Sequence, residues 1–116
     1  MSPKSVTIYH NPRCGKSRDT LALLQSRGLN PSIVEYLKDP PSASEIANIL
    51  KLLKVQAKDI VRKKEASEIG IDPNAMTESQ LCAAISRTPI IMERPIVVVD
   101  KKAALGRPPE NVIKIL

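Results

Sequence analysis

A strand-like run, a turn that contains a cysteine and a helix-like run follow one another near the start of the chain. Residues 6–9 are rich in β-forming side chains, Cys14 lies in the turn, and residues 16–27 have helical apolar spacing before Gly28. A second β-rich run at 32–36 follows the turn Asn30-Pro31. Because a helix connects the two strands, they are expected to be parallel with a right-handed crossover. This βαβ unit constrains the fold more than any other feature.

Cys14 is expected just before the first helix, in a position that alters the chemistry of a thiol. Unpaired backbone N–H groups and a partial positive charge at a helix N-terminus favour a thiolate. Arg13, Lys16 and Arg18 place more positive charge around it. We therefore predict an activated nucleophile with a pKa well below that of a free thiol. The alternative is a structural cysteine, which normally lies in apolar surroundings rather than among cations.

Residues 40–90 predict a group of helices. Two segments start with capping-box spacing, in which the first turn is closed by reciprocal hydrogen bonds: Ser42 with Glu45, and Thr77 with Gln80. Apolar residues at helical spacing follow each pair, and the second helix has to end before Pro89. Between them, a shorter helix is predicted at 58–64, and a helical turn with a loop at 66–74.

The last third of the chain predicts two strands and a helix. Four consecutive β-branched residues at 96–99 indicate a strand buried on both faces, followed by a turn at 100–101 and a return strand at 103–105. Pro108 opens a final helix with Val112, Ile113 and Leu116 facing inward. The order β-α-β, helices, β-β-α with a cysteine after the first strand predicts an α/β thioredoxin-like fold with a helical insert. The whole chain, residues 1–116, is expected to be a single domain.

Charge and composition narrow the choice of partners. The chain carries a net charge of +6, which suggests nucleic acid at first sight. However, the basic residues are scattered, no nucleic-acid-binding motif accompanies them, and Phe and Trp are absent, so bases would find few aromatic platforms. We expect no nucleic-acid partner, and a small anionic substrate fits the charge equally well. The protein is expected to be a monomer.

The cysteines give no sign of a disulfide framework or a metal site. Cys14 and Cys82 lie in unrelated contexts, and the chain has a single His. Cys82 lies in an apolar stretch of a predicted helix and is expected to be a core residue with no redox role. No signal-peptide-like segment or long apolar run is present, so we expect a cytoplasmic protein without membrane contact, whose thiols stay reduced.

The motif around Cys14 has one thiol where thioredoxin-like sites usually have two. Ser17 stands where the second cysteine of Cys-x-x-Cys would be, so Cys14 can attack once and then needs an external thiol. Three arginines are candidates to bind an anion, because a guanidinium fork suits tetrahedral oxyanions. Arg94 and Arg107 each precede a proline at a strand boundary, whereas Arg62 is equally compatible with a solvated surface position.

Three motifs resemble those of the glutaredoxin-coupled arsenate reductase (ArsC-type) family of the thioredoxin superfamily. They are Tyr9-His10-Asn11-Pro12-Arg13-Cys14-Gly15-Lys16-Ser17-Arg18, Glu93-Arg94-Pro95-Ile96-Val97-Val98 and Gly106-Arg107-Pro108-Pro109-Glu110. Val61-Arg62-Lys63 falls about where the family places its first substrate arginine. The likeness covers nearly the whole chain, which is similar to the short form without the C-terminal tail.

The resemblance implies a reaction. In this family the motif cysteine attacks arsenate to form a thiol-arsenate adduct, and glutathione with glutaredoxin completes the reduction to arsenite. Glutathione is thus a co-substrate, glutaredoxin a partner, and no tightly bound cofactor or metal is implied. The residues concerned are the nucleophile Cys14, the substrate-binding Arg62, Arg94 and Arg107, the thiolate-stabilising His10 and Ser17, and the cis-proline Pro95.

Two other functions compete with arsenate reduction. One is a related monothiol oxidoreductase that acts on another oxyanion or on glutathione mixed disulfides. The other is a regulator that resembles the Spx proteins, which share the fold and bind RNA polymerase. The Spx-type motif carries Cys-x-x-Cys, and Ser17 here lacks the second thiol. The set of three arginines favours arsenate over the other substrates.

Overall fold

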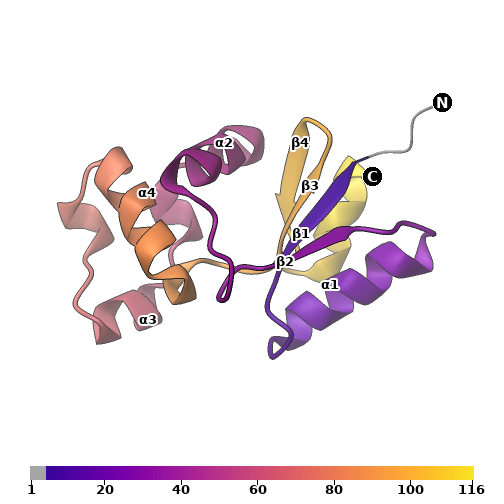
Figure 1. Cartoon of the computed structure of the whole chain (residues 1–116), viewed down its shortest axis with the longest axis horizontal. Helices are drawn as coiled ribbons and strands as arrows, with labels where there is room; N and C mark the ends of the chain where they lie inside the picture. Colours follow the sequence, from indigo (N-terminus) through magenta and orange to yellow (C-terminus); the bar gives the residue numbers. More distant parts are fainter. Residues whose placement is uncertain (1–4) are drawn as a thin grey trace. The chain divides into compact units, whose positions relative to one another are not determined.

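The chain passes through two units that are each closely packed. The computed structural model describes residues 5–116. An α/β unit comprises the described residues up to Asp39 together with Arg94–Leu116, and a helical unit comprises Pro40–Glu93 (Figure 1). The helical insert predicted between β-α-β and β-β-α therefore forms a unit of its own.

Four strands form one mixed sheet in the order β2-β1-β3-β4. Strand β1 (Val6–His10) pairs in parallel with β2 (Ser32–Glu35), and helix α1 (Gly15–Ser26) connects them. Strand β3 (Ile96–Val99) runs antiparallel to β1, and β4 (Lys102–Leu105) antiparallel to β3. The sequence prediction of an α/β thioredoxin-like fold is confirmed, including the parallel βαβ unit.

The core of the α/β unit consists of aliphatic side chains. Alternate residues of the strands turn to one face of the sheet, where Ile8 lies opposite Val97 and Val97 opposite Ala104. Leu24 of α1 and Val112 of the C-terminal helix η4 (Pro109–Ile115) belong to the same buried cluster. Each fully buried aliphatic side chain contributes about 1.5–3 kcal/mol, so this cluster holds α1 firmly against the sheet.

The final helix differs from the prediction in type. Helix η4 is a 3-10 helix, with three residues per turn, so Val112 and Ile115 share one face. Val112 is fully buried, and Ile115 and Leu116 pack partly buried against the core. The expected inward positions of Val112 and Leu116 are confirmed. That of Ile113 is wrong, because its side chain is 36% exposed.

The helical unit contains α2 (Ala43–Leu53), α3 (Lys63–Glu68) and α4 (Glu78–Arg87), joined by the short 3-10 helices η1 (Ala57–Ile60), η2 (Pro73–Ala75) and η3 (Pro89–Ile91). Both predicted capping boxes are present, with Ser42 accepting from the Glu45 N–H and Thr77 from the Gln80 N–H. Helices α2 and α4 contact each other through their buried apolar faces. Helix α4 ends before Pro89, as predicted.

The helix predicted at 58–64 is wrong. Helix η1 ends at Ile60 and α3 begins only at Lys63, with extended backbone between them. Val61 forms an antiparallel bridge with Met92, and the Arg62 N–H donates to the Ile91 carbonyl at 2.6 Å. Glu93 N–H donates in turn to the Ile60 carbonyl at 2.7 Å. These long-range hydrogen bonds take the place of helical ones, so the backbone polar groups of both segments, 60–62 and 91–93, still have partners.

The helices of the described residues are short. The longest, α1, has 12 residues, whereas a bilayer-spanning helix needs about 20 apolar residues. None of the helices within residues 5–116 is long and apolar enough to cross a membrane.

Cys82 offers a test of the helical core. Its side chain in α4 is 4% exposed, and burial together with the Glu78 charge raises the pKa of its thiol. We expect Cys82→Ala to lower the free energy of unfolding by about 1 kcal/mol, through the small cavity it leaves, and to leave the reactivity of Cys14 unchanged. Urea denaturation measures the free energy of unfolding, and the alkylation rate of Cys14 measures its reactivity. A folded Cys82→Ala variant in which Cys14 no longer reacts would show that Cys82 has a redox role.

Candidate active site

Cys14 closes the turn after β1 and opens α1. It is the N-cap residue, with φ −94° and ψ 123°. Its N–H donates to the Asn11 carbonyl at 3.0 Å, and its carbonyl accepts the Arg18 N–H at 3.0 Å. The predicted position before the helix is therefore confirmed. Cys14 is also partly exposed, as a thiol that attacks an external molecule has to be.

Several interactions act in opposite directions on the Cys14 thiol. Partial burial by itself would raise its pKa, since a charged thiolate loses hydration. Hydrogen bonding from the Ser17 backbone N–H, the side chain and charge of Arg94, and the Lys16 backbone N–H outweigh this and lower the pKa below its ordinary value. The helix N-terminus thus acts as predicted, through two of its unpaired N–H groups.

The cation that contributes to this lower pKa is Arg94, which the local sequence did not indicate. An effect of the Arg13, Lys16 and Arg18 side-chain charges on the thiol stays a prediction. All three residues are exposed, where water screens their charges. Arg18 donates instead to the Pro12 carbonyl at 3.1 Å, and Lys16 acts through its backbone.

The hydroxyl group of Ser17 fastens the first turn of α1 to the end of β1. Ser17 is fully buried, and its Oγ lies 2.6 Å from His10 Nδ1 and accepts the Asn11 N–H at 3.0 Å. The pKa of His10 is lowered, mainly by burial and further by the Arg18 charge, against an opposing effect of Glu35. Because the hydroxyl is held by His10 and Asn11, it is the backbone N–H of Ser17 that acts on the thiol.

Asn11 also builds this turn, although the sequence analysis did not single it out. The residue is 8% exposed, and its Oδ1 accepts the Arg13 N–H at 3.0 Å. Its carbonyl accepts the Cys14 N–H, and its own N–H donates to Ser17 Oγ, so Asn11 makes three hydrogen bonds within the turn. Asn followed by Pro after a strand is a turn signal, and that signal could have identified it.

The strand register brings the remaining candidates to the same edge of the sheet as Cys14. Tyr9, near the end of β1, lies opposite Ile96, the first residue of β3, and Ile96 lies opposite Leu105, the last residue of β4. The segment before β3 contains Arg94 and Pro95, and the segment after β4 begins with Gly106 and Arg107. Both segments therefore meet at the end of β1 that leads to Cys14.

Two hydrogen bonds join these segments. Arg107 Nη1 donates to the Arg94 carbonyl at 3.2 Å, and Gly106 N–H donates to the Pro95 carbonyl at 3.0 Å. The peptide bond before Pro95 is cis, as expected, and so is the bond between Arg107 and Pro108, which was not predicted. The α/β unit thus brings together Cys14, His10, Ser17, Arg94 and Arg107.

Arg62 belongs to the helical unit rather than to the α/β unit that holds Cys14. Its Nε donates to Glu65 Oε2, and its Nη1 lies 3.5 Å from Glu93 Oε2. The side chain is 20% exposed, so two carboxylates and the surrounding protein hold the guanidinium group. Its part in binding an anion stays a prediction.

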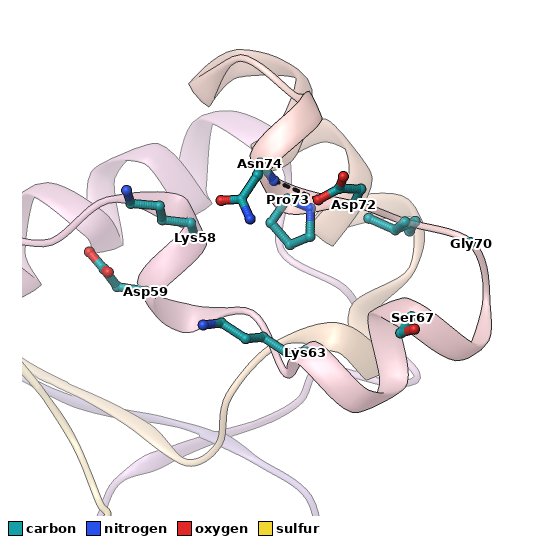
Figure 2. Close-up of a pocket in the computed structure, with 9 residues that line it drawn as sticks. Lys58, Asp59, Lys63, Ser67, Gly70, Asp72, Pro73 and Asn74 are labelled. Atoms are coloured by element: carbon teal, nitrogen blue, oxygen red, sulfur yellow. Dashed lines mark hydrogen bonds between the residues drawn. The ribbon is translucent and has the colours of Figure 1, made fainter.

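A pocket of about 620 Å³ lies within the helical unit (Figure 2). Lysine, aspartate, serine and asparagine residues line much of it, and Asp72 accepts the Asn74 N–H at 3.0 Å. The lining contains neither cysteine nor histidine, nor any of the candidate residues. The candidate nucleophile Cys14 therefore lies outside this pocket. Residues 5–116 contain no group of three or more His, Cys, Asp or Glu side chains that could hold a metal ion.

The geometry of the Cys14 turn defines a class of protein. A partly exposed cysteine of lowered pKa follows the first strand, the Arg94 side chain hydrogen-bonds to it, and Arg107 donates to the Arg94 carbonyl. Guanidinium groups attract anions and donate in a planar fork. This is a protein of thioredoxin-like fold with a cysteine of lowered pKa at the end of its first strand and an arginine in contact with that cysteine.

Comparison with known proteins gives the family. The model of the ArsC family matches residues 9–115, and the chain belongs to this family. It is 44% identical to the uncharacterized protein YfgD of Escherichia coli K12, covering 97% of this chain and 98% of that protein. It is 42% identical to an arsenate reductase of Haemophilus influenzae, covering 97% and 99%. The solved structure of an arsenate reductase from Vibrio cholerae superposes with a TM-score of 0.88 at 38% identity, covering 99% and 100%. The predicted resemblance to this family is confirmed.

The lowered pKa of Cys14 has a direct kinetic consequence. Only the thiolate reacts with iodoacetamide, so the alkylation rate should rise with pH around the pKa that Cys14 has in the folded protein. A lowered pKa moves this rise to lower pH, and Cys14 at neutral pH should react faster than the same residue in the unfolded chain. Mass spectrometry of the alkylated protein over a pH series measures it.

A Cys14→Ser variant provides the control for this titration. It retains Cys82, which should react slowly because it is buried and its pKa is raised. A midpoint for Cys14 equal to that of a free thiol would contradict the activation by Arg94 and the helix N-terminus.

Proposed function

We propose that the protein reduces arsenate to arsenite, with Cys14 as the nucleophile and glutathione and glutaredoxin as the source of electrons. The observation that carries this proposal is the contact between Arg94 and a Cys14 thiol of lowered pKa, with Arg107 bound to the Arg94 backbone. Relatives at about the same length that bear the name arsenate reductase support the choice of substrate.

In the first step the thiolate of Cys14 attacks the arsenic atom. A sulfur–arsenic bond forms and one oxygen leaves as water after protonation, while the arsenic stays pentavalent. Reduction to arsenite needs two electrons, which two thiols supply as they end in a disulfide. Since Ser17 occupies the place of a resolving cysteine, at least the second thiol comes from outside, and glutathione meets this need.

The arginines have two tasks in this mechanism. Arg94 and Arg107 offset the charge of the oxyanion and orient it, because their planar forks match two of its oxygens at once. Arg94 also lowers the pKa of Cys14 and so favours its thiolate before the substrate arrives. Arg62 is proposed as a third ligand on the resemblance alone. His10 and Ser17 are proposed to support the thiolate by fixing the first turn of α1 against β1.

The remaining parts of the proposal come from the resemblance and from the sequence. Glutaredoxin is the protein partner, glutathione is a co-substrate and no cofactor is tightly bound. The protein acts as a monomer in the cytoplasm, where a single thiol stays reduced between turnovers.

A turnover assay tests the reaction. Purified protein with arsenate, glutathione and glutaredoxin should form arsenite, and leaving out any one of the three should stop the reaction. Cys14→Ser should be inactive, because it removes the attacking thiol, whereas Cys82→Ala should retain activity. Arsenite is measured by chromatography with element-specific detection.

The same assay separates the competing function. A protein that leaves arsenate untouched but reduces a glutathione mixed disulfide would be the related monothiol oxidoreductase instead. After treatment with oxidised glutathione, the intact mass should show one glutathione on Cys14. An internal Cys14–Cys82 disulfide would contradict the need for an external thiol.

Substitution of lysine for arginine tests the oxyanion site. Arg94→Lys and Arg107→Lys keep the charge but lose the fork, so kcat/KM for arsenate should fall about tenfold or more in each, which corresponds to about 1.4 kcal/mol. Arg62→Lys, measured beside them, shows whether that residue takes part. Arg27→Lys, at the exposed C-terminal end of α1, is the matched control and should behave as wild type. Wild-type turnover of both Arg94→Lys and Arg107→Lys would show that the arginines do not hold the substrate.

A further inference from the structure

Gly106 lies where three segments of the α/β unit meet. It is buried directly after β4, and its N–H donates to the Pro95 carbonyl at 3.0 Å. On its other side, the Gly106 carbonyl accepts from Thr20 Oγ1 of α1 at 3.5 Å. Thr20 is itself fully buried, so this junction is closed to water. Gly106 therefore contacts both the helix that starts at Cys14 and the segment that carries Arg94.

The junction leaves no room for a side chain at position 106. A Cβ on Gly106 would lie 2.4 Å from Thr20 Oγ1, 2.8 Å from Pro95 Cγ and 3.0 Å from Thr20 Cγ2. These distances are well inside the ordinary contact of about 3.5–4.0 Å between carbon atoms. Gly28 differs, since it has φ +76° and open space around it, so its backbone conformation explains the glycine there. At Gly106 the requirement is space.

The two neighbours of Gly106 connect directly to the site. Thr20 belongs to α1, whose N-cap is Cys14, and its Oγ1 also bonds to the Lys16 carbonyl at 2.7 Å within the first turns. Pro95 follows Arg94 in the chain, and Arg107 follows Gly106 and donates to the Arg94 carbonyl. The separation between α1 and these two segments thus depends on the size of the side chain at position 106.

We propose that Gly106 is a positioning residue whose missing side chain lets β4 and the Arg94–Pro95 segment close against α1, and so sets Arg94 beside Cys14 and Arg107 against the Arg94 backbone. The role of the arginines in binding an oxyanion rests on the proposed function. The contact of Arg94 with the thiol does not, and it can be measured without any substrate.

The substitution Gly106→Ala tests the proposal. The added methyl group should push Pro95 and Thr20 apart, and the alkylation profile of Cys14 should move to higher pH as Arg94 leaves the thiol. Turnover of arsenate should fall about tenfold to hundredfold, mainly through a higher KM, because displacement of positioning groups by about 1 Å has effects of this size. Circular dichroism and urea denaturation first establish that the variant is folded.

Gly15→Ala is the matched control. A Cβ there would meet only Arg18 Nη2, at an ordinary 3.8 Å, so the alkylation profile of Cys14 should keep its wild-type midpoint. A second variant provides rescue, since Thr20→Ala removes the Oγ1 and Cγ2 atoms that crowd position 106. The double variant Thr20→Ala/Gly106→Ala should recover part of the shift. If Gly106→Ala does not fold, the double variant is compared with Thr20→Ala alone, because the contact with Pro95 Cγ remains and should still move the profile upward.

The outcomes are distinct. A folded Gly106→Ala protein with the wild-type alkylation profile overturns the proposal. Where Gly106→Ala does not fold, a double variant whose profile matches that of Thr20→Ala overturns it as well. A profile that moves in Gly106→Ala, and partly returns in the double variant, supports it whether or not the wild type reduces arsenate. Absence of arsenate turnover in the wild type, with the same movement of the profile, would refute the proposed function and leave the positioning role standing.

Discussion

The contact between Arg94 and the Cys14 thiol is the interaction on which the site depends. Burial alone would raise the pKa of Cys14, and the guanidinium group with two backbone N–H groups outweighs this and lowers it. In a partly buried setting such a charge acts more strongly than in water. The same cation can then serve twice, because it stabilises the thiolate and attracts an oxyanion to it. The advantage has a limit, since a thiolate of lower pKa is also a weaker nucleophile. A partly exposed cysteine with one nearby arginine is a compromise between a large thiolate fraction and a strongly nucleophilic thiolate.

Strand pairing is what turns distant residues into neighbours. The parallel pairing of β1 with β2 and the antiparallel pairing of β3 with β1 place the end of β1 beside the start of β3. The β3–β4 hairpin returns the chain to the same edge, so that Gly106 and Pro95 are joined by a backbone hydrogen bond. Neither arginine belongs to a strand or a helix. Both are fixed by the ends of elements that the buried aliphatic core holds in register.

Local signals in the sequence predicted much of this structure, and long-range contacts account for the failures. The capping boxes at Ser42 and Thr77 and the turn at Cys14 are fixed within a few residues, so the sequence predicts them. The helix expected at 58–64 is interrupted because Val61 pairs with Met92, which no local pattern indicates. The Arg-Pro context predicted Arg94 as an anion ligand, which stays a prediction, and its contact with Cys14 depends on the register of β1 and β3.

Ser17 shows why a missing second thiol is more than an absence. Its hydroxyl accepts the Asn11 N–H and contacts His10 Nδ1 in a fully buried space, so it satisfies polar groups of the turn and of β1 together. A thiol at this position would be larger and a weaker hydrogen-bond acceptor. It would leave the buried Asn11 N–H poorly satisfied, at a cost of about 1–3 kcal/mol. The serine thus gives the turn a rigidity that a cysteine would reduce. That rigidity holds the backbone N–H groups of Lys16 and Ser17 toward the sulfur, where they lower its pKa.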